Sequence, residues 1–186
     1  CLYLSRAYVT EKMHKEAYVL LDMCDKRAGD NPVFSFFKGK MEYEKGNKNQ
    51  STTYEDCISF YQLLAAKSDK IEMRTMGLTD SGKPLHIIIF SENNNFTFNQ
   101  NKAVLLFNNG IHPGEPDGID ASMMLARDIA KKKINMPNNV ALAIIPVYNI
   151  GGCLNRNSTT RVNQNGPLNF GFRGNAQNLD LNRDFI

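Results

Sequence analysis

The chain has 186 residues, of which 42% are hydrophobic and 10% aromatic, enough apolar side chains for one packed domain. Its 22 basic and 19 acidic residues give a net charge of only +3, which does not favour nucleic acid or an anionic membrane as the partner. No apolar run reaches the roughly 18 residues that a membrane-spanning helix needs, so the sequence predicts no such helix.

The first 47 residues have the pattern of paired helices. Apolar side chains recur at helical spacing through residues 2–28, and Pro32 ends that run. We expect a short α-helical, repeat-like segment over residues 1–47, which would offer a surface for a protein partner. Gly39, Tyr43 and Gly46 follow the proline in an order that resembles a tetratricopeptide repeat. In such a repeat, small side chains lie where two helices cross.

The remaining residues, 48–186, begin with a helix and a hairpin. Thr52-x-x-Glu55 has the pattern of a capping box, which predicts a helix over Tyr54–Lys67. Two strand-like runs follow, at Ile71–Gly77 and Leu85–Ser91. The turn residues Asp80-Ser81-Gly82 between them favour an antiparallel hairpin.

The rest of this part alternates strand, helix and strand. Ala103–Phe107 and Val140–Val147 are apolar runs of the length expected for buried strands, and Ile119–Lys133 has the pattern of an amphipathic helix. Residues 150–178 are rich in Gly, Asn, Arg and Gln, and a loop of this length within a domain is usually functional. The order of elements predicts an α/β fold, a three-layer α/β/α domain with a mixed sheet.

The segment NNGIHPGEPDG, residues 108–118, places His112 and Glu115 three positions apart between a predicted strand and a predicted helix. Catalytic zinc takes three protein ligands from His, Cys, Asp and Glu and keeps an open position for water. Pro113 and Gly114 favour a tight turn that would bring the two side chains to one point. On spacing alone, however, an ordinary polar turn is the better interpretation, because H-x-x-E arises often by chance.

Two segments further along favour the metal interpretation. STTRVNQNGP at residues 158–167 and NLDLNRDF at residues 178–185 follow the H-x-x-E pair in order. The combination resembles the zinc metallocarboxypeptidase family of the carboxypeptidase A type, which carries H-x-x-E after a strand, an arginine in the following loop, and then D-x-N-R. DSGKPLHIIIF and PVYNIGG are similar to the early hairpin of the family and to a later turn. The resemblance covers about residues 48–186 and implies the N-terminal part of such a domain.

The resemblance implies a role for each matching residue around the zinc ion. His112 and Glu115 would ligate one Zn²⁺, and Asp180 would accept the other ring N–H of His112, which fixes its tautomer. Asn182 and Arg183 would hold the terminal carboxylate of the substrate, for which a guanidinium is well shaped.

Arg161 would polarise the scissile carbonyl and stabilise the oxyanion that forms. Arg173, in GFRGN, competes for this role, but the RVNQNG context of Arg161 matches the family better. His86 lies within the apolar run LHIIIF and is expected to be a structural histidine, while His14 is expected on an exposed helix face.

The sequence departs from the family by what it lacks. The family uses a second histidine ligand downstream of the Asn-Arg pair and a late glutamate as general base, and neither occurs before Ile186. We therefore expect the chain to be a fragment of a longer enzyme, to have lost the last strands and helices of the sheet, and to bind zinc weakly.

The leading functional hypothesis is a zinc metallocarboxypeptidase that removes C-terminal residues from peptides with a free carboxylate. One alternative is a zinc deacylase of small N-acyl amino acids. The other is a non-catalytic module, in which the repeat-like helices and a degenerate peptidase half bind a partner. The resemblance favours export to the periplasm or the extracellular space.

Overall fold

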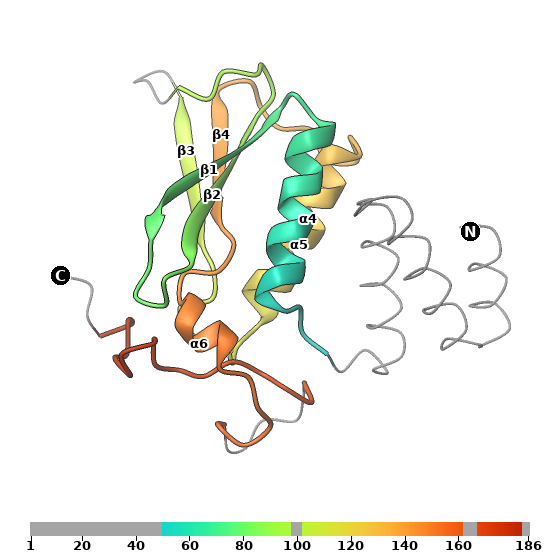
Figure 1. The fold of residues 1–186 in the computed structure, drawn as a ribbon. Helices are drawn as coiled ribbons and strands as arrows, with labels where there is room; N and C mark the ends of the chain where they lie inside the picture. Colours follow the sequence, from blue (N-terminus) through green and yellow to red (C-terminus); the bar gives the residue numbers. More distant parts are fainter. Residues whose placement is uncertain (1–49, 98–101, 162–166, 184–186) are drawn as a thin grey trace, which may run out of the picture. The chain divides into compact units, whose positions relative to one another are not determined.

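The computed structural model describes residues 50–97, 102–161 and 167–183. The chain divides into two compact units, Cys1–Gln50 and Ser51–Ile186, and every described helix and strand belongs to the second unit (Figure 1). The repeat-like segment predicted for residues 1–47, with His14, lies outside the described residues.

A mixed four-stranded sheet forms the centre of the second unit. Its strands lie in the order β1 (Ile71–Leu78), β2 (Pro84–Ser91), β4 (Val140–Ile145) and β3 (Ala103–Asn108). β1 and β2 form the predicted antiparallel hairpin, and β2 also runs antiparallel to β4. β3 runs parallel to β4, because the helix between them returns the chain to the same end of the sheet.

Two helices cover one face of the sheet, as Figure 1 shows. α4 (Tyr54–Lys67) and α5 (Asp117–Ala130) pack against alternate residues of the inner strands, which point to the same face. Burying a large aliphatic side chain such as Ile88 or Ile144 contributes about 1.5–3 kcal/mol, and both are fully buried. The α/β class and the mixed sheet predicted from the sequence are therefore confirmed.

The helix ends differ in detail from those predicted. α4 has the predicted bounds, but its N-cap is Thr53 and not Thr52, because Thr53 Oγ1 accepts the backbone N–H of Asp56 at 3.1 Å. α5 begins at Asp117, two residues before the predicted start. A third helix, the five-residue α6 (Ile150–Leu154), lies where only loop was predicted.

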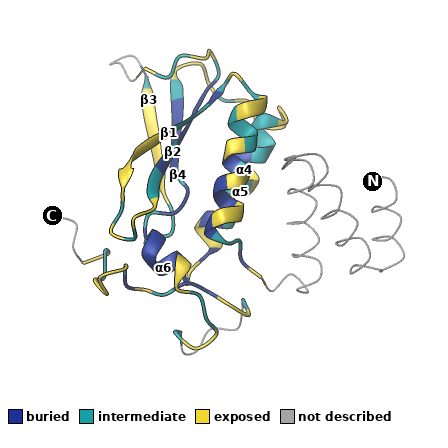
Figure 2. Cartoon of the chain, in the orientation of Figure 1, coloured by how far each residue is buried: buried dark blue, intermediate teal, exposed yellow. Residues whose placement is uncertain are grey.

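β3 is the one strand whose predicted environment is wrong. Its apolar residues led us to expect a buried strand, yet all six residues are exposed, and Figure 2 shows the strand in the exposed colour. The cause is its position: β3 is an edge strand, and no described strand pairs with its outer side. β4, which lies between two strands, is buried as predicted over most of its length.

Within the described part of the chain, no helix has both the length and the apolar character needed to cross a lipid bilayer.

Candidate zinc site

The predicted site residues gather beyond the carboxyl ends of the two parallel strands. The loops that leave β3 and β4 run together, with Tyr148 N donating to Asn109 O at 2.7 Å. His112 and Glu115 then form a tight turn in which Glu115 N donates to His112 O at 2.9 Å. The ends of parallel strands are the usual position of ligand sites in α/β sheets.

The His112 ring is held by a carboxylate from a distant loop. Its Nε2 lies 2.9 Å from Oδ1 of Asp180, and the second oxygen of Asp180 accepts Nε of Arg173 at 2.9 Å. The hydrogen bond from His112 is the largest cause that lowers the pKa of the Asp180 carboxyl, to about 2, and Arg173 acts in the same direction. Asp180 is thus an acceptor at neutral pH, so Nε2 donates to it; in the neutral imidazole the lone pair that can bind a metal then lies on Nδ1.

That lone pair faces the second predicted ligand. Nδ1 of His112 lies 3.8 Å from Oε1 of Glu115. Two atoms bound to one tetrahedral zinc at 2.0–2.1 Å lie about 3.3 Å apart, so a small movement of the half-exposed Glu115 side chain would bring both into ligand position. One imidazole nitrogen with its opposite N–H on a carboxylate, plus one carboxylate oxygen, fits the donor set of zinc.

Two guanidinium groups contact the same two acceptor atoms. Nη2 of Arg161 lies 2.8 Å from Oε1 of Glu115, and Nη1 of Arg173 lies 3.4 Å from Nδ1 of His112. Gly114 permits this arrangement, because a Cβ there would lie 2.6 Å from Cδ of Arg161. Positive charge therefore already surrounds the two atoms that a zinc ion would need.

The structure does not bring every predicted residue to this cluster. Asn182 and Arg183 are exposed, and their described contacts are local: Asn182 N donates to Asp180 Oδ1 at 3.1 Å, and Arg183 Nη1 donates to Asn182 O at 3.0 Å. Among the described residues, no group of three or more His, Cys, Asp or Glu side chains forms a metal site, so His112 and Glu115 have no third ligand there.

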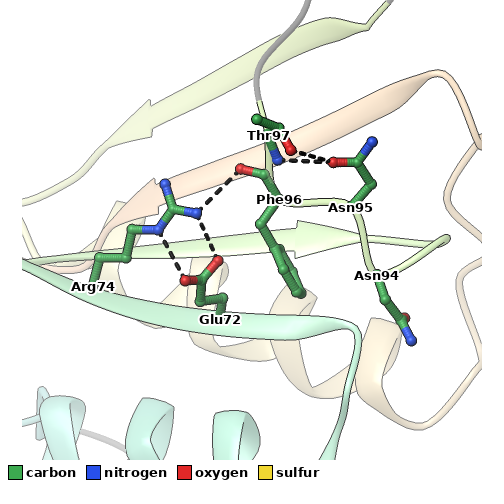
Figure 3. Close-up of a pocket in the computed structure, with 6 residues that line it drawn as sticks. All are labelled: Glu72, Arg74, Asn94, Asn95, Phe96 and Thr97. Carbon is green, nitrogen blue, oxygen red and sulfur yellow. Dashed lines mark hydrogen bonds and ion pairs between the residues drawn. The ribbon is translucent and has the colours of Figure 1, made fainter.

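One further predicted assignment concerns His86, and the structure adds a surface pocket that was not predicted. His86 is buried and its Nδ1 lies 3.2 Å from Thr75 Oγ1, as expected of a structural histidine, and burial lowers its pKa. A pocket elsewhere is lined by residues 94–97 and by Glu72 and Arg74 (Figure 3). Its arginine donates from Nε and Nη2 to the Glu72 carboxylate and from Nη2 to Phe96 O, so a carboxylate already balances its charge and the pocket is poorly suited to bind an anion.

Sequence reasoning missed one residue that organises the cluster. Asn149 stands in the PVYNIGG segment, which was linked to a turn and not to any role in the site. Its side chain is almost fully buried and forms hydrogen bonds to three separate backbone segments. The signal that the sequence offered was an asparagine shortly after the predicted strand, followed by Gly151 and Gly152.

Comparisons with known proteins concern the fold and the family of the chain. A model of the zinc carboxypeptidase family matches residues 57–186. The chain is similar to carboxypeptidase A from Helicoverpa armigera, with 20% identity over 56% of this chain and 26% of that chain and a TM-score of 0.50. It is similar to a putative carboxypeptidase A from Shewanella denitrificans OS-217, with 16% identity over 71% and 31% of the two chains and a TM-score of 0.54.

A metallo-carboxypeptidase from Burkholderia cenocepacia is also similar, with 18% identity over 73% of this chain and 33% of that chain and a TM-score of 0.53. At these identities the structures show the shared fold alone, and the chain spans one third or less of each. Among curated proteins, none matches the chain. The family model, in contrast, matches more than half of the chain, and the chain therefore belongs to the zinc carboxypeptidase family.

Proposed function

We propose that residues 48–186 form part of a zinc-dependent metallocarboxypeptidase that hydrolyses C-terminal residues from peptides. The observation that carries the proposal is the orientation of His112. Its Nε2 is held by Asp180, and its Nδ1 faces Glu115 at 3.8 Å. A histidine with one ring nitrogen on a carboxylate and the other directed at a second ligand is the arrangement of metal-ligating histidines, and here that carboxylate lies 68 positions along the chain.

His112 and Glu115 would hold the ion, and Asp180 would keep the His112 lone pair directed at it. When bound, zinc supplies a Lewis acid that lowers the pKa of a water molecule to about 7. Within the described residues this donor set lacks a third ligand, and we propose that the third ligand and the general base lie outside the described residues.

Arg161 is proposed to polarise the scissile carbonyl and to stabilise the oxyanion, since its guanidinium lies against a zinc ligand. Arg173 is the second candidate, because it lies against the other ligand. Asn182 and Arg183, which follow Asp180 after Leu181, have exposed side chains and are proposed to bind the terminal carboxylate of the substrate.

The test is hydrolysis of an N-blocked dipeptide with a free C-terminus by the native polypeptide that contains this chain, with and without a metal chelator. We expect Glu115→Gln to lower kcat/KM by more than about 100-fold, since losing a ligand should exceed the 10–100-fold typical of its hydrogen-bonding partners. Arg183→Gln should mainly raise KM. Arg127→Gln, which removes an arginine from the last turn of α5, is the matched control and should change neither.

Substrate choice separates this proposal from its alternative. The same dipeptide with an amidated C-terminus should be a poor substrate, because it lacks the carboxylate that Arg183 would bind. Activity that survives both the chelator and Glu115→Gln would contradict the zinc mechanism. Faster hydrolysis of a simple N-acyl amino acid than of the dipeptide would instead identify a deacylase.

A further inference from the structure

Asn149 is the most fully engaged polar residue near the site. It is the N-cap of α6, where its Oδ1 accepts the backbone N–H of Gly152 at 2.8 Å. Its own backbone N–H donates to Gly110 O at 3.1 Å, and its side chain is 1% exposed. An asparagine buried to this degree must satisfy its amide donors within the protein.

Both amide donors go to the two segments that meet at the His112 ring. Nδ2 donates to Ile111 O at 3.3 Å, directly before His112, and to Arg173 O at 3.0 Å. Arg173 in turn contacts His112 Nδ1 and Asp180. One amide group therefore sets the backbone of the ligand turn and the backbone of the arginine loop at a fixed separation.

The packing beside Asn149 leaves little freedom for the arginine loop. Gly152 O accepts Phe172 N at 2.8 Å, so the residue that Asn149 caps also binds the loop. A Cβ on Gly152 would lie 2.4 Å from Phe172 O and 2.7 Å from Asn149 Nδ2. The start of α6 and the loop are thus in direct backbone contact, and the Asn149 amide bridges that contact to the end of β3.

We propose that Asn149 is a positioning residue, which holds Arg173 and Asp180 against the His112 ring through the two N–H donors of its side chain. The catalytic meaning of this geometry rests on the proposed function, but the geometry itself does not. The chemical requirement is specific: one group must accept from a helix N-terminus and donate to two carbonyls, and among short side chains only an amide does both.

The test separates the donors from the helix cap. Asn149→Ser keeps an oxygen that caps α6, because serine is as good an N-cap as asparagine, but it loses both N–H bridges. Asn149→Asp keeps the size and the cap and serves as the second variant if the first does not fold. Thr53→Ala, which removes the cap of α4 far from these bonds, is the control for a general loss of stability.

The readout is hydrogen exchange of the Arg173 Nε–H, which donates to Asp180, measured by NMR relative to backbone amides of β4. In the Asn149 variants we expect its exchange to accelerate about tenfold or more beyond that of the β4 amides. In Thr53→Ala the exchange rates of the Arg173 Nε–H and of the β4 amides should change by the same factor. An Arg173 signal that keeps its protection in a folded Asn149 variant would overturn the proposal.

A double-mutant cycle gives an independent measurement on the unfolding equilibrium. If Asn149 positions Asp180, the effect of Asp180→Asn should shrink in the Asn149→Ser background, whereas independent sites give additive effects. Additivity would overturn the proposal. Neither measurement depends on catalysis. If Asn149 and Asp180 are coupled but the protein shows no zinc-dependent hydrolysis, the positioning role of Asn149 stands and only the proposed function is contradicted.

Discussion

At the scale of single residues, the site is defined by the partners of the two ring nitrogens of His112. Asp180 accepts the hydrogen bond of Nε2, and Nδ1 is contacted by the guanidinium of Arg173. The carboxylate of Glu115 is likewise contacted by Arg161. These arginines stabilise the two ligand atoms electrostatically, and a metal ion must compete with them for the same atoms.

This competition leads to a prediction for zinc affinity. Arg161→Met should tighten zinc binding to the 186-residue chain about threefold to tenfold, because a partly exposed ion pair contributes roughly 0.2–1 kcal/mol and a nearby positive charge is lost as well. Affinity would be measured by competition with a chelating dye. Arg127→Met removes the same charge from α5 and should have no effect, and unchanged or weaker binding by Arg161→Met would contradict the idea.

Asp120 leads to a prediction for pH. Burial raises the pKa of this carboxyl, on α5, to about 6, while a backbone hydrogen bond from Thr52 and the charge of Arg156 act in the opposite direction. Between about pH 4 and 6 the folded state therefore holds a proton that the unfolded chain has released. The stability that this proton provides is present below pH 4 and is lost as pH rises through 6.

We expect the free energy of unfolding to fall by about 1–2 kcal/mol from this group between pH 4.5 and 7.5, and Asp120→Asn to remove that fall. Urea denaturation at the two pH values measures it. Asp117→Asn, in the same helical turn but exposed, should keep most of the wild-type difference, because the charge of Asp117 raises the Asp120 pKa less than burial does. A wild-type difference that persists in Asp120→Asn would show that another group is responsible.

At the scale of the elements, α4 shows how a cap selects the start of a helix. Two overlapping patterns in the sequence, Thr52 with Glu55 and Thr53 with Asp56, each predict an N-cap. The structure uses the second pair, with Thr53 Oγ1 bonded to both the backbone N–H and the carboxylate of Asp56. The choice is consistent with the backbone of Thr52, whose carbonyl is already bound to Arg156.

The two patterns differ in a measurable way. Thr53→Ala should lower the free energy of unfolding by about 1 kcal/mol through loss of the cap. Thr52→Ala should change it by less than about 0.5 kcal/mol, since it removes only one long, partly buried hydrogen bond between neighbouring residues. Chemical denaturation of both variants decides the matter, and a larger loss in Thr52→Ala would restore the capping box first predicted.

Sequence patterns predicted the elements whose local signals were strong. The hairpin, α4 and β4 were found because their periodicity and turn residues agree with their surroundings. α6 was missed because five residues with two glycines carry no helical period. β3 was predicted to be buried because its residues are apolar. Apolar content indicates that burial would be favourable, but it does not show whether neighbouring elements cover the strand.

The site was predictable only in part, for a related reason. The resemblance linked His112, Glu115 and Asp180, and the structure brings these three together. The contacts of Arg161 and Asn149 are set by how loops from different strands pack, and no local pattern encodes such distances. Sequence motifs indicate which residue types a site contains. The positions of those residues depend on hydrogen bonds to the buried backbone, which no motif specifies.

At the scale of the whole molecule, the outer edge of β3 is the main exposed apolar surface that the described residues present. Val104, Leu105, Leu106 and Phe107 are all exposed, along an edge that bears no proline or charged residue. An unprotected edge of this kind tends to pair with other strands. The related structures are about three or more times the length that this chain matches, so their folds contain much additional polypeptide.

For the 186-residue chain alone, this edge predicts self-association. Leu106→Lys should lower the association constant about tenfold or more, because a lysine on an edge strand opposes strand pairing. Met124→Lys is a matched control, since Met124 on α5 has the same 56% exposure as Leu106. Sedimentation velocity over a range of concentrations measures both, and equal behaviour of the two variants would exclude β3 as the contact.

The bond between His112 and Asp180 also has a consequence for the order of folding. It joins residues 68 positions apart, while the hairpin of β1 and β2 forms between near neighbours. Closing a long loop costs more conformational entropy, and the contacts that offset this cost form only after the loop has closed. The sheet and its helices can therefore form first, and the ligand turn acquires its fixed histidine only when the last described loop docks.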